Sequence, residues 1–291
     1  MRKSLLLSFV ALGAIASSAF AADLPTHKGP PPAPIVVAPP FSWTGFYGGL
    51  NGGYADPTAK LSVAAPAGSG WATDHDWTAN ANGPGVAAVG TDNIGLHGFI
   101  GGAQAGYNYQ INNIVIGAEA DADYMNLNGS YSTPHYSGFA GGTPPNDTYW
   151  ASGSASVDSL FTLRLRAGLA VDHWLFFVTG GLAVTGEKFS QSINYLNYAA
   201  PPPPITLPST GPGGGANAGS ASTTAVTGVI GGGVEYAFDK NWSIKGEYLY
   251  VPLKSLDFTS VSTANAAYTI QHHEGLSALN VFRIGLNYRF N

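Results

Sequence analysis

Apolar and polar side chains alternate without a break over residues 282–290. The apolar ones are Phe282, Ile284, Leu286, Tyr288 and Phe290, and between them stand Arg283, Gly285, Asn287 and Arg289. Because side chains of a β-strand point alternately to its two faces, this pattern predicts a strand with one apolar and one polar face. A segment of about ten such residues is typical of a strand that crosses an outer membrane, with lipid on one side.

Seven earlier segments show the same period of two. They span approximately residues 43–54, 97–109, 114–124, 161–169, 174–184, 226–238 and 242–250. In lipid every backbone N–H and C=O needs a partner within the protein, and the edges of an open sheet lack one. The sequence therefore predicts an all-β fold, an eight-stranded antiparallel transmembrane β-barrel with up-and-down topology. A soluble β-sandwich is the alternative.

The connections between these segments are of two kinds. Residues 110–113, 171–173 and 239–241 form short polar links, whereas residues 55–96, 129–156, 190–222 and 259–277 are long and rich in Gly, Pro, Ser, Thr and Asn. Tight turns on one side and long surface loops on the other are the arrangement of outer-membrane barrels. An even number of strands places both ends of the barrel on the short-turn, periplasmic side.

The N-terminal region has the features of an exported chain. Arg2 and Lys3 precede an apolar run that ends in the small-residue pattern Ala19-Phe20-Ala21, which predicts a signal peptide over residues 1–21. The proline-rich stretch that follows predicts an extended linker. We assign residues 22–42 to a periplasmic linker and residues 43–291 to the barrel, and we expect the protein in the outer membrane.

Composition removes several classes of function. The chain has no cysteine, which excludes a disulfide framework, a zinc-thiolate site and a thiol nucleophile. Its 17 acidic residues outnumber its 12 basic ones, and an acidic balance argues against nucleic acid as a partner.

Charged residues of the predicted strands share the face opposite the apolar one. They are Glu119, Asp121, Asp123, Arg164, Arg166, Glu235, Lys245, Glu247, Arg283 and Arg289. An eight-stranded barrel is just wide enough to be filled by its own side chains. Five acids and five bases on the inner face therefore predict a lumen plugged by ion pairs. A narrow polar pore is the alternative.

Four histidines lie on the predicted loops, namely His75, His135, His272 and His273. They are candidate ligands for haem or a metal ion. However, adjacent side chains on an extended chain point to opposite sides, so His272 and His273 do not chelate one ion. We expect solvated histidines, no metal site and no cofactor, with a haem-binding surface receptor as the alternative.

The pair His135 and Ser137 permits an enzyme hypothesis, in which the histidine activates the hydroxyl. Such a base needs a third group to orient it, and the spacing supplies none. We therefore expect no enzymatic activity.

Two segments carry a resemblance to a known family. The first is Phe41-Ser42-Trp43-Thr44-Gly45-Phe46-Tyr47-Gly48-Gly49, which follows Ala-Asp-Leu-Pro and a proline-rich stretch, and the second is the closing segment from Arg283 to Phe290. Both resemble the small outer-membrane immunogenic, porin-family proteins of alpha-proteobacteria. Asn291 after Phe290 departs from the usual aromatic ending.

The resemblance implies a barrel inserted by the barrel assembly machinery, which recognises an aromatic C-terminal strand, here through Tyr288 and Phe290. It also implies roles in envelope integrity and host contact. Some members bind haemin, for which this sequence has no matching motif. We expect a structural and surface-interaction protein whose partners are outer-membrane lipid and host or surface ligands at the loops. The sequence makes no prediction of oligomeric state.

Overall fold

The computed structural model describes residues 41–70, 83–134, 136–137, 147–197 and 214–290. The chain divides into two compact units, Met1–Pro40 and Phe41–Asn291. The predicted signal peptide and nearly all of the predicted linker lie outside the described residues. Among the described residues, no helix combines the length and the apolar character needed to cross a membrane.

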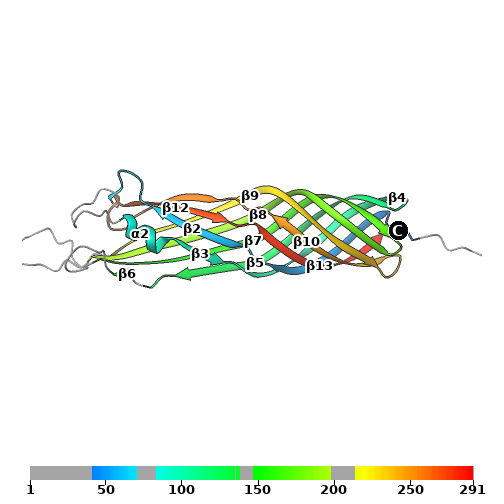
Figure 1. Ribbon diagram of the computed structural model, residues 1–291, viewed down its shortest axis with the longest axis horizontal. Coiled ribbons are helices and arrows are strands. Elements are labelled where there is room, and N and C mark those ends of the chain that lie inside the picture. The colour runs from blue at the N-terminus through cyan, green and yellow to red at the C-terminus, as the bar shows by residue number, and fades with distance from the viewer. Residues whose placement is uncertain (1–40, 71–82, 135, 138–146, 198–213, 291) are drawn as a thin grey trace, which may run out of the picture. The chain divides into compact units, whose positions relative to one another are not determined.

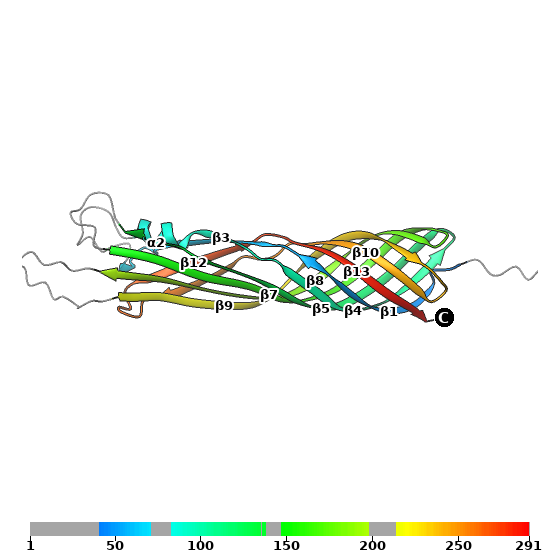
Figure 2. The same cartoon turned by 90° about the horizontal axis from the view of Figure 1, so that it is seen from below.

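Eight antiparallel strands form a closed ring (Figures 1 and 2). They are β1 (Gly45–Ala55), β4 (Gly98–Ile111), β5 (Ile114–Ser132), β7 (Asp147–Val171), β8 (Trp174–Asn197), β9 (Gly214–Ala237), β10 (Trp242–Val251) and β13 (Leu279–Phe290). Each strand of the ring pairs with the next, and β13 pairs with β1 to close it. The short β6 (Tyr136–Ser137) adds to the edge of β7. The predicted eight-stranded antiparallel barrel is confirmed.

The three predicted tight turns connect strands at one end of the ring. Asn112 and Asp172 have φ values of 56° and 52°, in the left-handed region that Asn and Asp tolerate better than most residues. In the third turn the Asp239 carboxylate accepts hydrogen bonds from the backbone N–H groups of Asn241 and Trp242, at 2.7 and 2.6 Å. Asn112 and Asp172 thus suit the backbone conformation of their turns, and Asp239 supplies the hydrogen-bond acceptor of the third turn.

Large apolar side chains cover the outside of the ring near these turns. They belong to residues 46–54, 99–111, 114–124, 161–171, 174–182, 226–238, 242–250 and 282–290. Phe99 and Leu165, for example, are 76% and 72% exposed. A continuous apolar surface of this size is stable against lipid and not against water. We call this surface the lipid belt.

The four predicted long loops are wrong over much of their described length, because the strands continue well beyond the lipid belt. Residues 71–82, 135, 138–146 and 198–213 of these loops lie outside the described residues. β7 has 25 residues and β8 has 24, which is about 80 Å of strand, whereas crossing a membrane takes about 9–11 residues. β5 and β9 continue in the same way. We call the part of the barrel beyond the belt the extension.

A second, four-stranded sheet completes the wall of the extension. Its order is β11 (Leu256–Val261), β12 (Thr269–Leu276), β2 (Thr58–Ala64) and β3 (Asp92–Gly95). These strands continue β10, β13, β1 and β4 across short breaks in the chain. Isolated bridges between His97 and Asn128 and between Asn217 and Ser262 join its two edges to β5 and β9. The order of the ring is therefore repeated above the membrane.

The chemistry of the two faces reverses between the belt and the extension. On β8 the side chains of Trp174, Phe176 and Val178 point outward in the belt, whereas those of Phe189 and Ile193 are buried inside the extension. The alternation itself continues in phase along the strand. Outside the extension is water, so its polar side chains point out and its apolar ones pack inward.

The helix α2 (Gly83–Gly90) packs against β2 and β7.

His272 lies inside the extension, on strand β12, so its predicted position on a solvated loop is wrong. Its side chain is 1% exposed, and burial lowers its pKa to about 4, which keeps the ring neutral. Nδ1 donates to Gln191 Oε1 and Nε2 accepts from Ser260, both at 2.6 Å. Gln191 in turn donates to the Gly90 carbonyl oxygen at 2.9 Å. His272 therefore links three strands to α2.

His273 is likewise on β12 but points outward, 2.6 Å from Asp257.

We predict that His272→Ala loosens the extension, because it leaves buried polar atoms of Gln191 and Ser260 without their partner, at about 1–3 kcal/mol for each group. Amide hydrogen exchange in β11 and β12 should become at least tenfold faster. His273→Ala, the neighbour on the same strand with an exposed side chain, should leave exchange unchanged. Equal protection in the two variants would contradict this role of His272.

Candidate functional site

The predicted inner charges lie at the level of the lipid belt, on the side chains that point into the barrel. All ten are at most 5% exposed. The register of β5 and β7 places Glu119 opposite Arg164, and β9, β10 and β13 contribute the others from the remaining wall. The alternation that exposes apolar side chains to lipid thus gathers the charges in one interior layer.

Arg164 is the centre of this layer. Its guanidinium donates to Asp121 at 2.8 Å and to Glu247 at 2.6 Å, and it also bonds Glu119. Its Nε donates to Thr162 at 2.9 Å. The three carboxylates come from β5 and from β10, on the opposite side of the ring order. Charge-assisted bonds of this kind are the strongest hydrogen bonds in proteins.

Two further cations complete the layer. Arg283 donates to Glu247 and to Asp123, both at 2.8 Å, and to Asp121 at 3.2 Å. Lys245 donates to both oxygens of Glu119, at 2.8 and 2.9 Å. Every one of these side chains has contacts that cross the lumen or bridge neighbouring strands. The interior at this level is filled by ion pairs.

Arg166 extends the layer toward the turn end of the barrel. It donates to Glu235 at 2.8 Å, and its guanidinium lies 4.1 Å from the centre of the Phe177 ring. Tyr47 donates its hydroxyl to Glu119 at 2.7 Å and accepts from Arg166 at 3.2 Å. Tyr47 was not predicted as a lumen residue, although its inward parity on β1 marks it as one.

Arg289 does not join the layer, so the expected match of five acids with five bases is wrong. Among the described residues it forms no ion pair with a carboxylate. Its guanidinium lies 4.7 Å from the Phe41 ring and 4.9 Å from the Trp43 ring, and it bonds the Ser42 carbonyl. Five acids therefore share four bases, and Arg289 stacks on aromatic rings instead.

Apolar layers lie on both sides of the charged layer. At the turn end the buried side chains are Trp43, Val115, Ala170, Leu175, Phe177 and Ala237, with Phe41 packed against them. On the other side, a larger cluster that includes Met125, Leu127, Leu160, Leu249 and Val281 fills the start of the extension. Neither layer was predicted, because the sequence pattern placed residue 43 only in a strand and indicated loops over much of the extension. The two apolar layers separate the charges from water at both ends.

Two acids inside the extension were also missed. Glu187 and Glu274 are 2% and 1% exposed, and each has one carboxylate oxygen without a hydrogen-bond partner among the described residues. Burial, reinforced by the neighbouring Glu187, raises the pKa of Glu274 to about 8. Glu274 is therefore mostly neutral at pH 7, as expected for an acid in a largely apolar interior.

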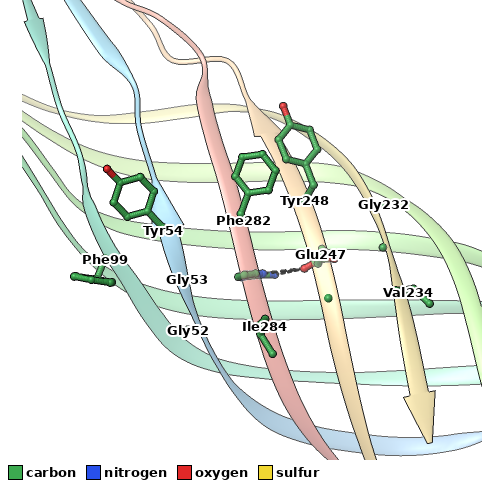
Figure 3. A pocket seen from close by; sticks show the side chains of 13 residues that line it. Gly52, Gly53, Tyr54, Phe99, Gly232, Val234, Glu247, Tyr248, Phe282 and Ile284 are labelled. Carbon is green, nitrogen blue, oxygen red and sulfur yellow. Dashed lines mark hydrogen bonds and ion pairs between the residues drawn. The ribbon is translucent and has the colours of Figure 1, made fainter.

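A groove of about 670 Å³ lies on the outside of the lipid belt (Figure 3). Tyr54, Phe99, Tyr248 and Phe282 border it, above a floor of glycines and strand backbone. Glu247 and Arg283 contribute to this floor, but their paired side chains have no exposed surface. The groove faces lipid, and its lining is mainly apolar.

The other predicted site residues are scattered. His75 and His135 lie outside the described residues, and Ser137 belongs to the short strand β6. Tyr288 and Phe290 point outward at the end of β13, with their rings 5.2 Å apart, and Asn291 lies outside the described residues. In the described part of the chain, no three His, Cys, Asp or Glu side chains come together as metal ligands.

Comparison with known proteins places this architecture in a family. A 31 kDa outer-membrane immunogenic protein of Brucella melitensis is 30% identical, over 99% of this chain and 100% of its own. A 25 kDa outer-membrane immunogenic protein of the same species is 28% identical, over 88% and 94%. Among solved structures, OprG of Pseudomonas aeruginosa is 10% identical with a TM-score of 0.31, over 86% of this chain and 98% of its own.

Ail of Yersinia pestis is 10% identical with a TM-score of 0.24, over 82% and 98%. The family whose description is "Outer membrane protein beta-barrel domain" matches residues 7–290. That match spans nearly the whole chain and agrees with the closed ring and its lipid belt. The chain therefore belongs to the outer membrane beta-barrel family, and its location is the outer membrane.

Proposed function

We propose that this protein is a sealed barrel that anchors the extension at the cell surface, with a structural and surface-interaction role in the envelope. The observation that carries this proposal is the charged layer, in which Arg164 binds three carboxylates within the lumen. A conducting pore needs a continuous path for water, and these side chains occupy that path. The two apolar layers above and below add further barriers.

Energetics support a permanently closed lumen over a gated one. A side chain that swung aside to open a path would leave a buried charge without its partner, and breaking such a pair costs about 3–5 kcal/mol. Arg164, Arg283 and Lys245 share their carboxylates, so movement of one cation disturbs the others as well. The network therefore favours stability and a fixed register over gating.

The extension supports the surface role. Its walls rise far beyond the length that a bilayer requires, and by the rule for outer-membrane barrels the end opposite the tight turns faces the outside. The names of the Brucella relatives record that those proteins are immunogenic. We infer that the extension of this chain is likewise presented to host or surface ligands.

Two further partners follow from the same proposal. The lipid belt binds outer-membrane lipid, and the outward Tyr288 and Phe290 of β13 are the aromatic signal read by the barrel assembly machinery. The proposal includes no catalytic role, because the side chains of the charged layer are paired and shielded from water and include no accessible nucleophile.

The proposal is tested by recording currents across planar lipid bilayers that contain the purified, folded protein. We expect no steady unitary conductance, because side chains block the lumen at three levels. Bilayers with an open porin serve as the positive control, and protein-free bilayers as the blank. Uniform, stepwise channels that scale with the amount of protein would contradict a structural role and support a narrow pore.

We predict that Arg164→Met destabilises the folded barrel by about 3–5 kcal/mol, because it leaves Glu119, Asp121 and Glu247 in the closed interior with too few cations. Urea unfolding in lipid vesicles, followed by tryptophan fluorescence, measures the change. The matched control is Lys188→Met, which removes a cation from an exposed ion pair with Asp158. We expect no shift of the unfolding midpoint in that variant. Equal midpoints for both variants would mean that the charged layer does not hold the barrel together.

A further inference from the structure

One outer face of the extension consists almost entirely of hydroxyl and amide side chains. It is formed by β5, β7, β8 and β9, whose outward residues lie in register across the four strands. One row is Ser130, Ser154, Ser190 and Ser220, and its neighbours are Asn128, Ser156, Lys188 and Ser222 on one side and Ser132, Ser152, Ser192 and Ala218 on the other. We call these three rows the serine face.

The serine face begins where the lipid belt ends. On β5 the last large apolar outward residue is Tyr124, and Asn126 through Ser132 continue the same outward face. From Tyr124 to Ser132 is about 26 Å along the strand, or about 19 Å in height at a tilt of 45°. The polar headgroup layer of an ordinary bilayer adds only about 5–8 Å on each side of the hydrocarbon. The top of the serine face therefore lies more than twice as far beyond the lipid belt as a phospholipid headgroup reaches.

The hydroxyl groups of this face are available for binding. Ser154 and Ser190 bond each other at 2.9 Å, whereas Ser130, Ser220 and Ser222 have no hydrogen-bond partner among the described residues. Each hydroxyl is both a donor and an acceptor. The residues that carry these hydroxyls stand about 4.8 Å apart across strands and about 6.8 Å apart along them. Two open depressions of about 560 and 390 Å³, which share Ser154, Ser190 and Ser220, lie on the face.

The composition of the face selects one kind of occupant. Acyl chains are excluded by its lack of large apolar side chains among the outward residues. The buried centre of a protein interface normally needs aromatic or arginine anchors, which the three rows do not contain. Lys188 is the only charged residue in the rows, and Asp158 neutralises it at 2.6 Å. An uncharged lattice of donors and acceptors matches a polyhydroxyl chain.

We propose that the serine face binds the oligosaccharide headgroup of the glycolipid that surrounds the barrel in the outer leaflet. Continuity with the lipid belt identifies this source, because the acyl chains of a lipid packed on the belt end where the face begins. Small serine side chains let a sugar ring approach the sheet closely and exchange hydrogen bonds with several rows at once. This inference goes beyond the proposed function, since it does not depend on whether the lumen conducts.

The test uses the full-length protein in detergent and the core oligosaccharide released from purified lipopolysaccharide of the same bacterium, titrated by isothermal calorimetry. We expect saturable binding by the wild type. The variant Ser154→Ala/Ser190→Ala/Ser220→Ala should bind at least tenfold more weakly. The matched control is Ser62→Ala/Thr259→Ala/Gln271→Ala, which removes outward polar groups from β2, β11 and β12 on the other wall. It should bind like the wild type.

Several outcomes would overturn the proposal. They are an absence of binding by the wild type, equal binding by the serine variant, and equal weakening in both variants. Far-UV circular dichroism and the shift in gel mobility on boiling verify that each variant is folded before titration. Because Ser154, Ser190 and Ser220 are exposed, their replacement by alanine removes hydroxyls without creating cavities.

Discussion

The guanidinium of Arg164 holds carboxylates from β5 and β10, two strands that lie on different sides of the ring. These charges neutralise one another only when the ring is closed and each strand is in its native register. A one-residue slip would turn a strand's charges toward lipid, where each costs several kcal/mol. The same contacts that block the lumen therefore select a single closed barrel, and closure in turn satisfies the backbone within the membrane.

The surroundings of the wall determine the rest of the architecture. In the lipid belt, apolar side chains point outward and polar ones inward, and beyond the belt the same strands carry the opposite chemistry. The charged layer thus lies between two apolar layers, one around Trp43 and one around Leu127. Inside the extension, His272 and Gln191 join the wall to α2 through neutral hydrogen bonds. On the outside of the extension, polar side chains of β5, β7, β8 and β9 form the serine face.

The sequence predicted the membrane part well and the extension poorly, for a physical reason. Strands such as residues 282–290 present large apolar side chains in strict alternation with polar or charged ones. Only a strand with lipid on one face and a polar interior on the other explains this pattern. In the extension the outward residues of β5, β7, β8 and β9 are mostly serines, which occur equally in loops, so a strand such as the first half of β7 gives only a weak signal. The inward positions of Glu119, Arg164 and Arg283 followed from parity. Parity did not predict that Arg289 lies outside the charged layer, because the rings it contacts belong to Phe41 and Trp43, which precede β1.

The absence of native cysteine permits the most direct test of a sealed interior. A single cysteine is introduced in Asn51→Cys, at an inward position of β1 that is 8% exposed, and a second protein carries Ser154→Cys on the outer surface. Both are treated in lipid vesicles with a water-soluble maleimide. A closed lumen predicts rapid labelling at position 154 and labelling at position 51 only after unfolding in urea. Labelling at both positions at similar rates in the folded protein would show a water-filled channel and contradict the account.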